Sequence, residues 1–138
     1  MHRASRALVA HANARTFEQL GVSSAQLAAL YYVAKRPGCS MTEIADVLDL
    51  NKSAMSATVH RLVHAGHLRR DPHPRDGRAN LLFLTPKGEA IRAQSLPIIR
   101  RLTAQLTEGF TDDDMAVIFR FLNSVVERYG DEAKEGEP

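Results

Sequence analysis

Polar side chains recur at helical spacing in a short stretch near the middle of the chain. Residues 52–64 contain no Gly or Pro, so the stretch can form a single helix. Ammonium, guanidinium and imidazole groups can contact phosphates, and short hydroxyls can reach phosphates or base edges. A face of this kind suits the major groove of DNA, which admits one α-helix. The candidate face comprises Lys52, Ser53, Ser56, His60 and Arg61.

A second basic group follows in the segment 71–78. The segment holds Arg75, Asp76 and Arg78 together with two prolines and Gly77, all of which favour turns and loops. Residues 67–70 precede it and the largely apolar run 79–84 follows it, and we expect these two segments to form strands. The sequence therefore predicts a hairpin with a basic tip, as in the wing of a winged helix.

Charge is unevenly distributed along the 138 residues, whose formal net charge is only +2. Residues 51–101 contain ten basic and three acidic side chains, whereas residues 102–138 contain three basic and nine acidic ones. A basic middle on an otherwise near-neutral protein is typical of a nucleic-acid-binding face. An unevenly charged, solvated surface remains the alternative on charge alone.

Composition indicates a single globular domain, with 44% hydrophobic and 25% charged residues. No run approaches the roughly 20 apolar residues of a membrane span, and the start lacks the apolar core of a secretory signal. The lone cysteine, Cys39, cannot form an internal disulfide, which fits a reducing compartment. We expect a cytoplasmic protein without a membrane partner.

Helix signals place the candidate face in a larger pattern. Residues 2–19 favour a helix that Gly21 ends, and Ser23 with Gln26 forms a capping-box pattern for the next helix. Ser40 opens a short third helix that ends near residue 50. Asn51 then caps the helix that carries the polar face. The few residues between these last two helices are the spacing of a helix–turn–helix.

Two further helices follow the hairpin. Thr85 and Pro86 open the first, and Pro97 lies inside it, where we expect a kink rather than a break into two helices. Gly109 ends it, and Thr111 opens the last helix, which we expect to end near residue 130 with a frayed tail. The apolar face of the last helix comprises Met115, Ile118, Phe119, Leu122, Val125, Val126 and Tyr129.

This order of elements, with four short motifs, resembles the MarR family of bacterial transcription regulators. The motifs are NKSAMS at 51–56, LVHAGHL at 62–68, DGR at 76–78 and LFLTPKG at 82–88. The most specific feature is Asp-x-Arg in a wing followed by Leu-x-Leu-Thr-x-x-Gly. Members often carry a basic residue where this chain has Ala57, which implies a different base contact or operator preference.

The resemblance implies a mainly α fold with a small β wing, in one domain spanning residues 1–138. A winged helix-turn-helix DNA-binding lobe would occupy about 23–88, and a helical dimerisation lobe about 2–20 and 89–130. The function implied is a ligand-responsive repressor that binds a pseudo-palindromic operator in double-stranded DNA as a homodimer, with recognition helices about 34 Å apart. Arg78 would enter the minor groove, Asp76 would orient it, and Arg75 would contact phosphate.

The resemblance also implies a small anionic or phenolic effector, of unspecified identity, between the dimer helices and the DNA-binding lobe. Tyr31, Tyr32, His11 and Arg15 are candidate pocket groups, although each also suits ordinary packing or surface positions. The effector would change the spacing of the two recognition helices.

Other functions remain as alternatives. One is a winged helix that binds protein instead of DNA, and another is a redox regulator using Cys39, whose place before a helix start could lower the thiol pKa. His60 and His64 share i, i+4 spacing but have no evident third metal ligand. We expect no enzyme, cofactor or metal site, because no phosphate loop, nucleophile–base set or metal triad occurs.

Overall fold

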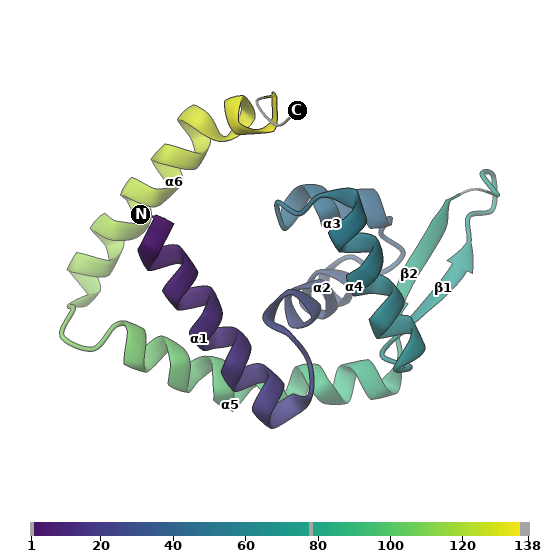
Figure 1. The fold of residues 1–138 in the computed structure, drawn as a ribbon, viewed down its shortest axis with the longest axis horizontal. Coiled ribbons are helices and arrows are strands. Elements are labelled where there is room, and N and C mark those ends of the chain that lie inside the picture. Colours follow the sequence, from purple (N-terminus) through teal and green to yellow (C-terminus); the bar gives the residue numbers. More distant parts are fainter. Residues whose placement is uncertain (1, 78, 136–138) are drawn as a thin grey trace. The chain divides into compact units, whose positions relative to one another are not determined.

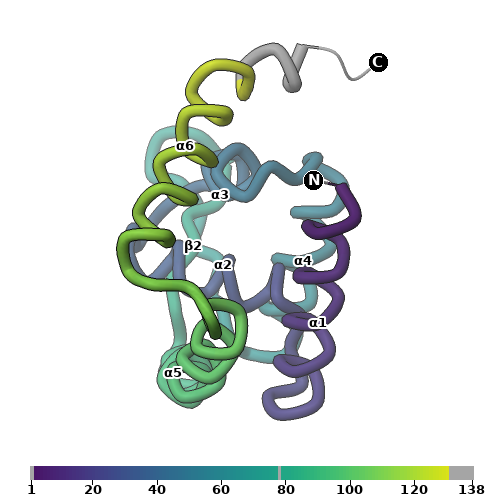
Figure 2. Tube along the Cα trace, turned by 90° about the vertical axis from the view of Figure 1, so that its left-hand side faces the viewer, coloured from purple at the N-terminus to yellow at the C-terminus, as the bar shows by residue number. Residues whose placement is uncertain are grey.

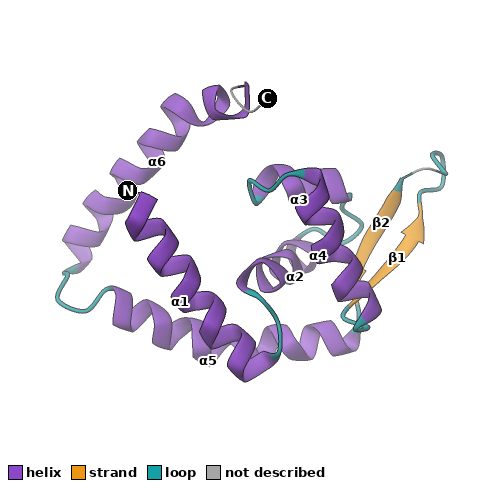
Figure 3. Ribbon diagram, in the orientation of Figure 1, coloured by secondary structure: helices purple, strands orange, loops and turns teal. Residues whose placement is uncertain are grey.

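The computed structural model describes residues 2–77 and 79–135, and their side chains as far as Gly130. The chain divides into two compact units, Met1–Arg100 and Arg101–Pro138, with the boundary inside one helix. The elements along the chain are α1 (His2–Leu20), α2 (Ser24–Lys35), α3 (Met41–Val47), α4 (Lys52–His64), β1 (Leu68–Pro72), β2 (Asn80–Leu84), α5 (Pro86–Leu106) and α6 (Asp112–Glu135), as Figures 1 and 3 show. The expected fold class, mainly α with a small β wing, is confirmed.

The hydrophobic core of the first unit joins the helix–turn–helix to the hairpin. Its buried side chains come from α2, α3, α4 and both strands, and α2 lies beside β2 in both views (Figures 1 and 2). Leu82 donates its amide to the Cys39 carbonyl at 3.0 Å and accepts from Gly38 at 2.8 Å, so the hairpin is bonded to the turn before α3. The core comprises Ala29, Leu30, Val33, Cys39, Ile44, Ala45, Met55, Val59, Leu62, Leu68 and Leu82.

Side-chain caps begin the three helices of this lobe as the sequence predicted. The amide of Gln26 donates to the Ser23 hydroxyl at 3.0 Å, and that of Glu43 donates to the Ser40 hydroxyl at 3.2 Å. The Asn51 side chain accepts the amide of Ala54 at 2.7 Å. Each cap satisfies an amide that has no partner inside its helix, so these starts are fixed by local sequence.

The two strands differ from the predicted ones at their ends. The prediction placed the first strand at 67–70, but β1 runs from Leu68 to Pro72, and Asp71 and Pro72 pair with Leu81 and Asn80. A two-stranded sheet leaves one edge of β1 open, and proline is tolerated there because its missing N–H breaks no ladder bond. The loop is therefore shorter than predicted and begins at His73.

Helix α5 begins as predicted, with Pro86 first and the Gly88 amide donating to the Thr85 hydroxyl at 3.1 Å. It continues unbroken across Pro97, so the alternative of two separate helices is wrong. The helix ends at Leu106, and the turn after it contains Gly109 at a φ of +85°, a conformation that glycine adopts without strain.

Helix α6 is capped by a reciprocal pair. Asp114 donates its amide to the Thr111 hydroxyl at 3.2 Å, and its carboxylate accepts the Thr111 amide at 2.8 Å. Hydrogen bonding to the carboxylate by the Thr111 amide, and then by the Thr111 hydroxyl, lowers the pKa of the Asp114 carboxyl. The expected end near Gly130 is wrong, because the helix continues to Glu135 through residues that favour helix.

Both terminal helices expose large apolar side chains. On α1 these include Val9, 56% exposed, and Phe17, 63% exposed. On α6 the exposed apolar residues are Val117, Phe119, Phe121, Leu122, Val126 and Tyr129.

No helix among the described residues is long and apolar enough to span a membrane.

Candidate nucleic-acid interface

Helix α4 presents the predicted polar face to solvent. Its opposite face is fully buried at Met55, Val59 and Leu62, which fixes the rotation of the helix about its axis. Lys52 is the first residue of the helix, where the positive end of the helix dipole adds to its charge. The five predicted side chains, Lys52, Ser53, Ser56, His60 and Arg61, are all exposed on α4.

The two histidines of α4 lie one turn apart. The ring centroids of His60 and His64 are 6.4 Å apart with planes 17° from parallel, and both side chains are exposed. Among the described residues no group of three or more His, Cys, Asp or Glu side chains is placed to hold a metal ion. The structure therefore adds no third ligand to this pair.

The end of α4 is held by the first turn of α5. The Thr85 hydroxyl donates to the Gly66 carbonyl at 2.6 Å, and the Lys87 ammonium donates to the Ala65 carbonyl at 2.8 Å. Gly88 packs so closely that a Cβ on it would lie 2.1 Å from the His67 carbonyl oxygen. We call this contact, made by Thr85, Lys87 and Gly88, the α4–α5 clasp. Sequence reasoning found Thr85 as the start of a helix and Lys87 and Gly88 as part of a family motif, and it missed the contact of all three with the residues that follow α4.

His67 lies under the clasp and is only 8% exposed. Burial, followed by the positive charge of Lys87, lowers the pKa of its imidazole. The Nδ1 atom has no hydrogen-bond partner among the described residues. The neutral form of His67 is therefore the one that fits at this buried position after α4.

Arg78, the main predicted wing residue, lies outside the described residues. Arg75 and Asp76 are exposed at the tip of the hairpin. Nearer its base, Arg69 binds the Asp71 carboxylate with two bonds of 3.0 Å and lies 5.0 Å from the centre of the Phe83 ring. Bonding to Asp71 raises the pKa of the Arg69 guanidinium and fixes that side chain along the strand.

The wing tip is closed by His73. Its Nδ1 atom accepts the backbone amides of Arg75 and Asp76, each at 3.1 Å. Its own amide donates to the Ala79 carbonyl at 3.0 Å, and the Ala79 amide donates to the Asp76 carbonyl at 3.1 Å. Sequence reasoning assigned no role to His73 and so missed this one.

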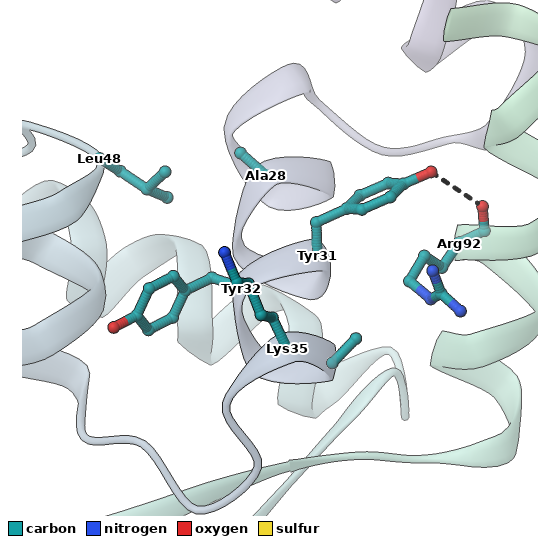
Figure 4. A pocket seen from close by; sticks show the side chains of 7 residues that line it. Ala28, Tyr31, Tyr32, Lys35, Leu48 and Arg92 are labelled. Carbon is teal, nitrogen blue, oxygen red and sulfur yellow. Dashed lines mark hydrogen bonds between the residues drawn. The ribbon is translucent and has the colours of Figure 1, made fainter.

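A cavity of about 420 Å³ lies between α2 and α5 (Figure 4). The Tyr31 hydroxyl lies 2.8 Å from the Ser95 hydroxyl and donates to the Arg92 carbonyl at 3.4 Å. The Arg92 guanidinium lies 5.5 Å from the centre of the Tyr31 ring, and its bond to Glu89 raises its pKa. The lining comprises Ala28, Tyr31, Tyr32, Ala34, Lys35, Leu48 and Arg92.

Two of the four candidate pocket groups thus line the cavity, and two do not. Tyr31 and Tyr32 are in the lining, whereas Arg15 forms an exposed pair with Glu18 at 3.3 Å. His11 is exposed on α1 and is absent from that lining. Arg92 was not predicted, because its approach to the tyrosines depends on how α2 and α5 pack. Lys35 was also missed, although it lies one helical turn after Tyr31 on α2, a spacing that the sequence shows.

Cys39 is 3% exposed and belongs to the core. Burial, followed by the charge of Glu43, raises the pKa of its thiol. The expectation that a helix start lowers this pKa is wrong, because desolvation of the thiolate outweighs the nearby amides. A buried thiol with a raised pKa is a poor sensor for oxidants.

A helix–turn–helix, a two-stranded wing and flanking helices define the winged helix-turn-helix class. The model of the MarR family matches residues 20–79 of the chain. The multiple antibiotic resistance protein MarR of Escherichia coli is 30% identical over 108 residues, which cover 78% of this chain and 75% of that protein. The chain therefore belongs to the MarR family and is a transcriptional regulator.

Two solved structures are similar over most of their length. A mutant of Escherichia coli MarR complexed with operator DNA has a TM-score of 0.79 at 26% identity, covering 91% of this chain and 92% of the other. The PcaV regulator of Streptomyces coelicolor in complex with its natural ligand has a TM-score of 0.80 at 26% identity, covering 91% and 90%.

Proposed function

We propose that this regulator is a repressor that binds a pseudo-palindromic operator in double-stranded DNA as a homodimer. The observation that carries the proposal is the exposed polar face of α4, whose rotation is fixed by a completely buried opposite face. A helix held in this way can dock in the major groove with a defined set of side chains. The similar MarR mutant was crystallised with operator DNA, which supports the same role for this chain.

The contacts divide by residue type. Lys52 at the helix start and Arg61 further along supply positive charge for phosphates. Ser53, Ser56 and His60 face the same side and can reach base edges. Ala57, where relatives often carry a basic residue, leaves this turn without a strong base contact and favours a different operator preference.

The wing supplies the second set of contacts in this proposal. Arg78 enters the minor groove, Asp76 orients it, and Arg75 contacts phosphate. We assign residues 23–88 to DNA binding, and residues 2–20 and 89–130 to dimerisation, within one domain spanning 1–138. The exposed apolar residues of α1 and α6 support the dimer, since large apolar patches of this kind mark protein–protein contacts.

Arg78→Ala should weaken operator binding by about 10- to 100-fold, because a specific arginine contact contributes roughly 1–3 kcal/mol. The measurement is a mobility-shift titration at moderate salt on a duplex selected from genomic fragments. Arg69→Ala is the matched control on the same hairpin, and little loss is expected because Asp71 already holds Arg69 along the strand. Unchanged affinity of Arg78→Ala would refute the wing assignment, and no shift by the wild type would favour a protein-binding winged helix.

We also propose a small anionic or phenolic effector bound in the cavity between α2 and α5. Lys35 and Arg92 supply positive charge there, and Tyr31 and Tyr32 supply aromatic surface and hydroxyls. The similar PcaV structure holds a natural ligand, which supports an effector for this chain as well. Binding would favour one arrangement of the recognition helices and so release DNA.

4-Hydroxybenzoate, which carries both a carboxylate and a phenol, should release the wild-type protein from the selected duplex. Arg92→Ala should need about tenfold more of this compound, because a charged hydrogen bond contributes roughly 1.5–3 kcal/mol. Arg100→Ala, further along α5 and outside the lining, is the control. Equal release curves for the two variants, measured by fluorescence anisotropy, would remove Arg92 from the effector site.

A further inference from the structure

The loop at the wing tip is organised around one imidazole. His73 Nδ1 accepts two consecutive backbone amides, from Arg75 and Asp76, and the His73 amide closes the loop through Ala79. Pro72 and Pro74 flank the histidine, and their fixed φ angles restrict the backbone on both sides. The path of residues 73–77 is therefore set by a side chain within the loop.

An imidazole nitrogen accepts a hydrogen bond only when it carries a lone pair. The two bonds at Nδ1 therefore need the neutral ring with its hydrogen on Nε2. Protonation places a hydrogen on Nδ1. The nitrogen then becomes an N–H donor itself and faces the two backbone N–H donors of Arg75 and Asp76. A single protonation thus removes both bonds and adds repulsion between donors.

We propose that His73 is a positioning residue for operator binding, whose neutral imidazole holds the wing tip and whose protonation releases it. The proposal rests on the proposed contact between the wing and DNA. It makes the affinity of this regulator for its operator lower when the His73 ring is protonated than when the ring is neutral.

Among the described residues of the hairpin, the charged groups nearest to His73 in the sequence lie on β1 and in the loop. Arg75 and Asp76 lie in the loop, and Asp71 lies on β1 two residues before the histidine. The paired strand β2, Asn80–Leu84, contains no titratable side chain. DNA phosphates would attract an imidazolium, so a purely electrostatic role would give the opposite trend, with tighter binding at low pH.

Asparagine offers a matched substitution. The Oδ1 atom of asparagine and the Nδ1 atom of histidine are both bonded to Cγ, and an asparagine oxygen accepts backbone amides in the same kind of turn. Because the amide does not titrate, His73→Asn should keep the loop closed at every pH. His73→Ala removes the acceptor and should leave the tip open at every pH.

The DNA test compares wild type, His73→Asn and His73→Ala on the selected duplex between about pH 5.5 and 8. The wild type should lose about tenfold in affinity on acidification, since two hydrogen bonds are lost. His73→Asn should bind tightly throughout, and His73→Ala weakly throughout. Histidines 60, 64 and 67 are retained in all three proteins, so their contributions cancel in the comparison. The same pH profile for wild type and His73→Asn would overturn the proposal.

A second measurement needs no DNA. Long-range ¹H–¹⁵N correlation spectra of the free wild-type protein should show an unprotonated Nδ1 at neutral pH, and the Arg75 and Asp76 amide signals should shift together on acidification. A protonated Nδ1 at neutral pH would overturn the role of His73. A third outcome separates the two proposals. If the spectra are as expected but neither His73→Ala nor Arg78→Ala changes the affinity for DNA, then His73 does hold the loop, and the proposed contact between the wing and DNA is refuted.

Discussion

Gly88→Ala is expected to remove a large part of the free energy of unfolding, about 4 kcal/mol or more. The added Cβ would lie 2.1 Å from the His67 carbonyl oxygen and 3.0 Å from the carbonyl carbon. Both are backbone atoms, so no side-chain rotation can relieve the overlap. The start of α5 would have to move away from the segment that follows α4.

That movement would also break the rest of the α4–α5 clasp. The bonds from Thr85 to Gly66 and from Lys87 to Ala65 satisfy carbonyls after the end of α4. Their loss adds to the cost of the clash. A domain has a total stability of only about 5–15 kcal/mol, so the variant should lose a large fraction of it.

The measurement is urea unfolding followed by circular dichroism. Gly130→Ala is the control, because a Cβ there would lie 3.6 Å from Val126 Cγ1, an ordinary contact. Since Gly130 lies within α6, alanine should stabilise that helix by up to about 1 kcal/mol. A Gly88→Ala midpoint equal to the wild type's would show that the clasp can open without cost.

Leu122→Glu is expected to convert the proposed dimer into a monomer and to lower operator affinity by about 100-fold or more. Leu122 lies within the apolar face of α6 and is 42% exposed in the single chain. A carboxylate at this position would have to be buried without a partner if the face is an interface between two copies. A monomer binds one half-site and loses the gain from binding two at once.

Ala116→Glu is the matched control, since Ala116 is exposed on the same helix away from the main apolar face. It adds the same charge and should leave the dimer intact. Light scattering gives the mass of each variant, and truncation after Leu106 should also give a monomer. A monodisperse dimer of Leu122→Glu, or of the truncated chain, would contradict the assignment of α6 to the interface.

Features of the fold that depend on local chemistry were predictable. Ser23, Ser40, Asn51 and Thr111 each begin a helix through a side chain that bonds an amide three residues on. The exposed face of α4 was also predictable, because the 3.6-residue period separates it from the buried face.

Features that depend on how distant segments approach were not predictable from one sequence. Pro72 reads as a loop residue, but it pairs in β1 because that edge of the sheet is open. Gly88 and Lys87 reach His67 and Ala65, which follow α4, only once the start of α5 packs against that segment. Lys35 and Arg92 are far apart in sequence and meet at one cavity. His73 acts locally, but histidine is an unusual acceptor in such a turn, so its pattern gave no signal.

The base of the hairpin is bonded to other parts of the lobe, whereas its tip is held by hydrogen bonds within its own loop. Its base is bonded to Gly38 and Cys39 and buries Leu68 and Leu82 in the core, whereas its tip is closed by His73 within the loop. The residues that fold the lobe are therefore separate from those of the proposed contact between the wing and DNA. Under that proposal, substitutions between His73 and Ala79 can change which operators are recognised while the buried base of the hairpin stays unchanged, which gives related regulators a route to diverge in their target genes.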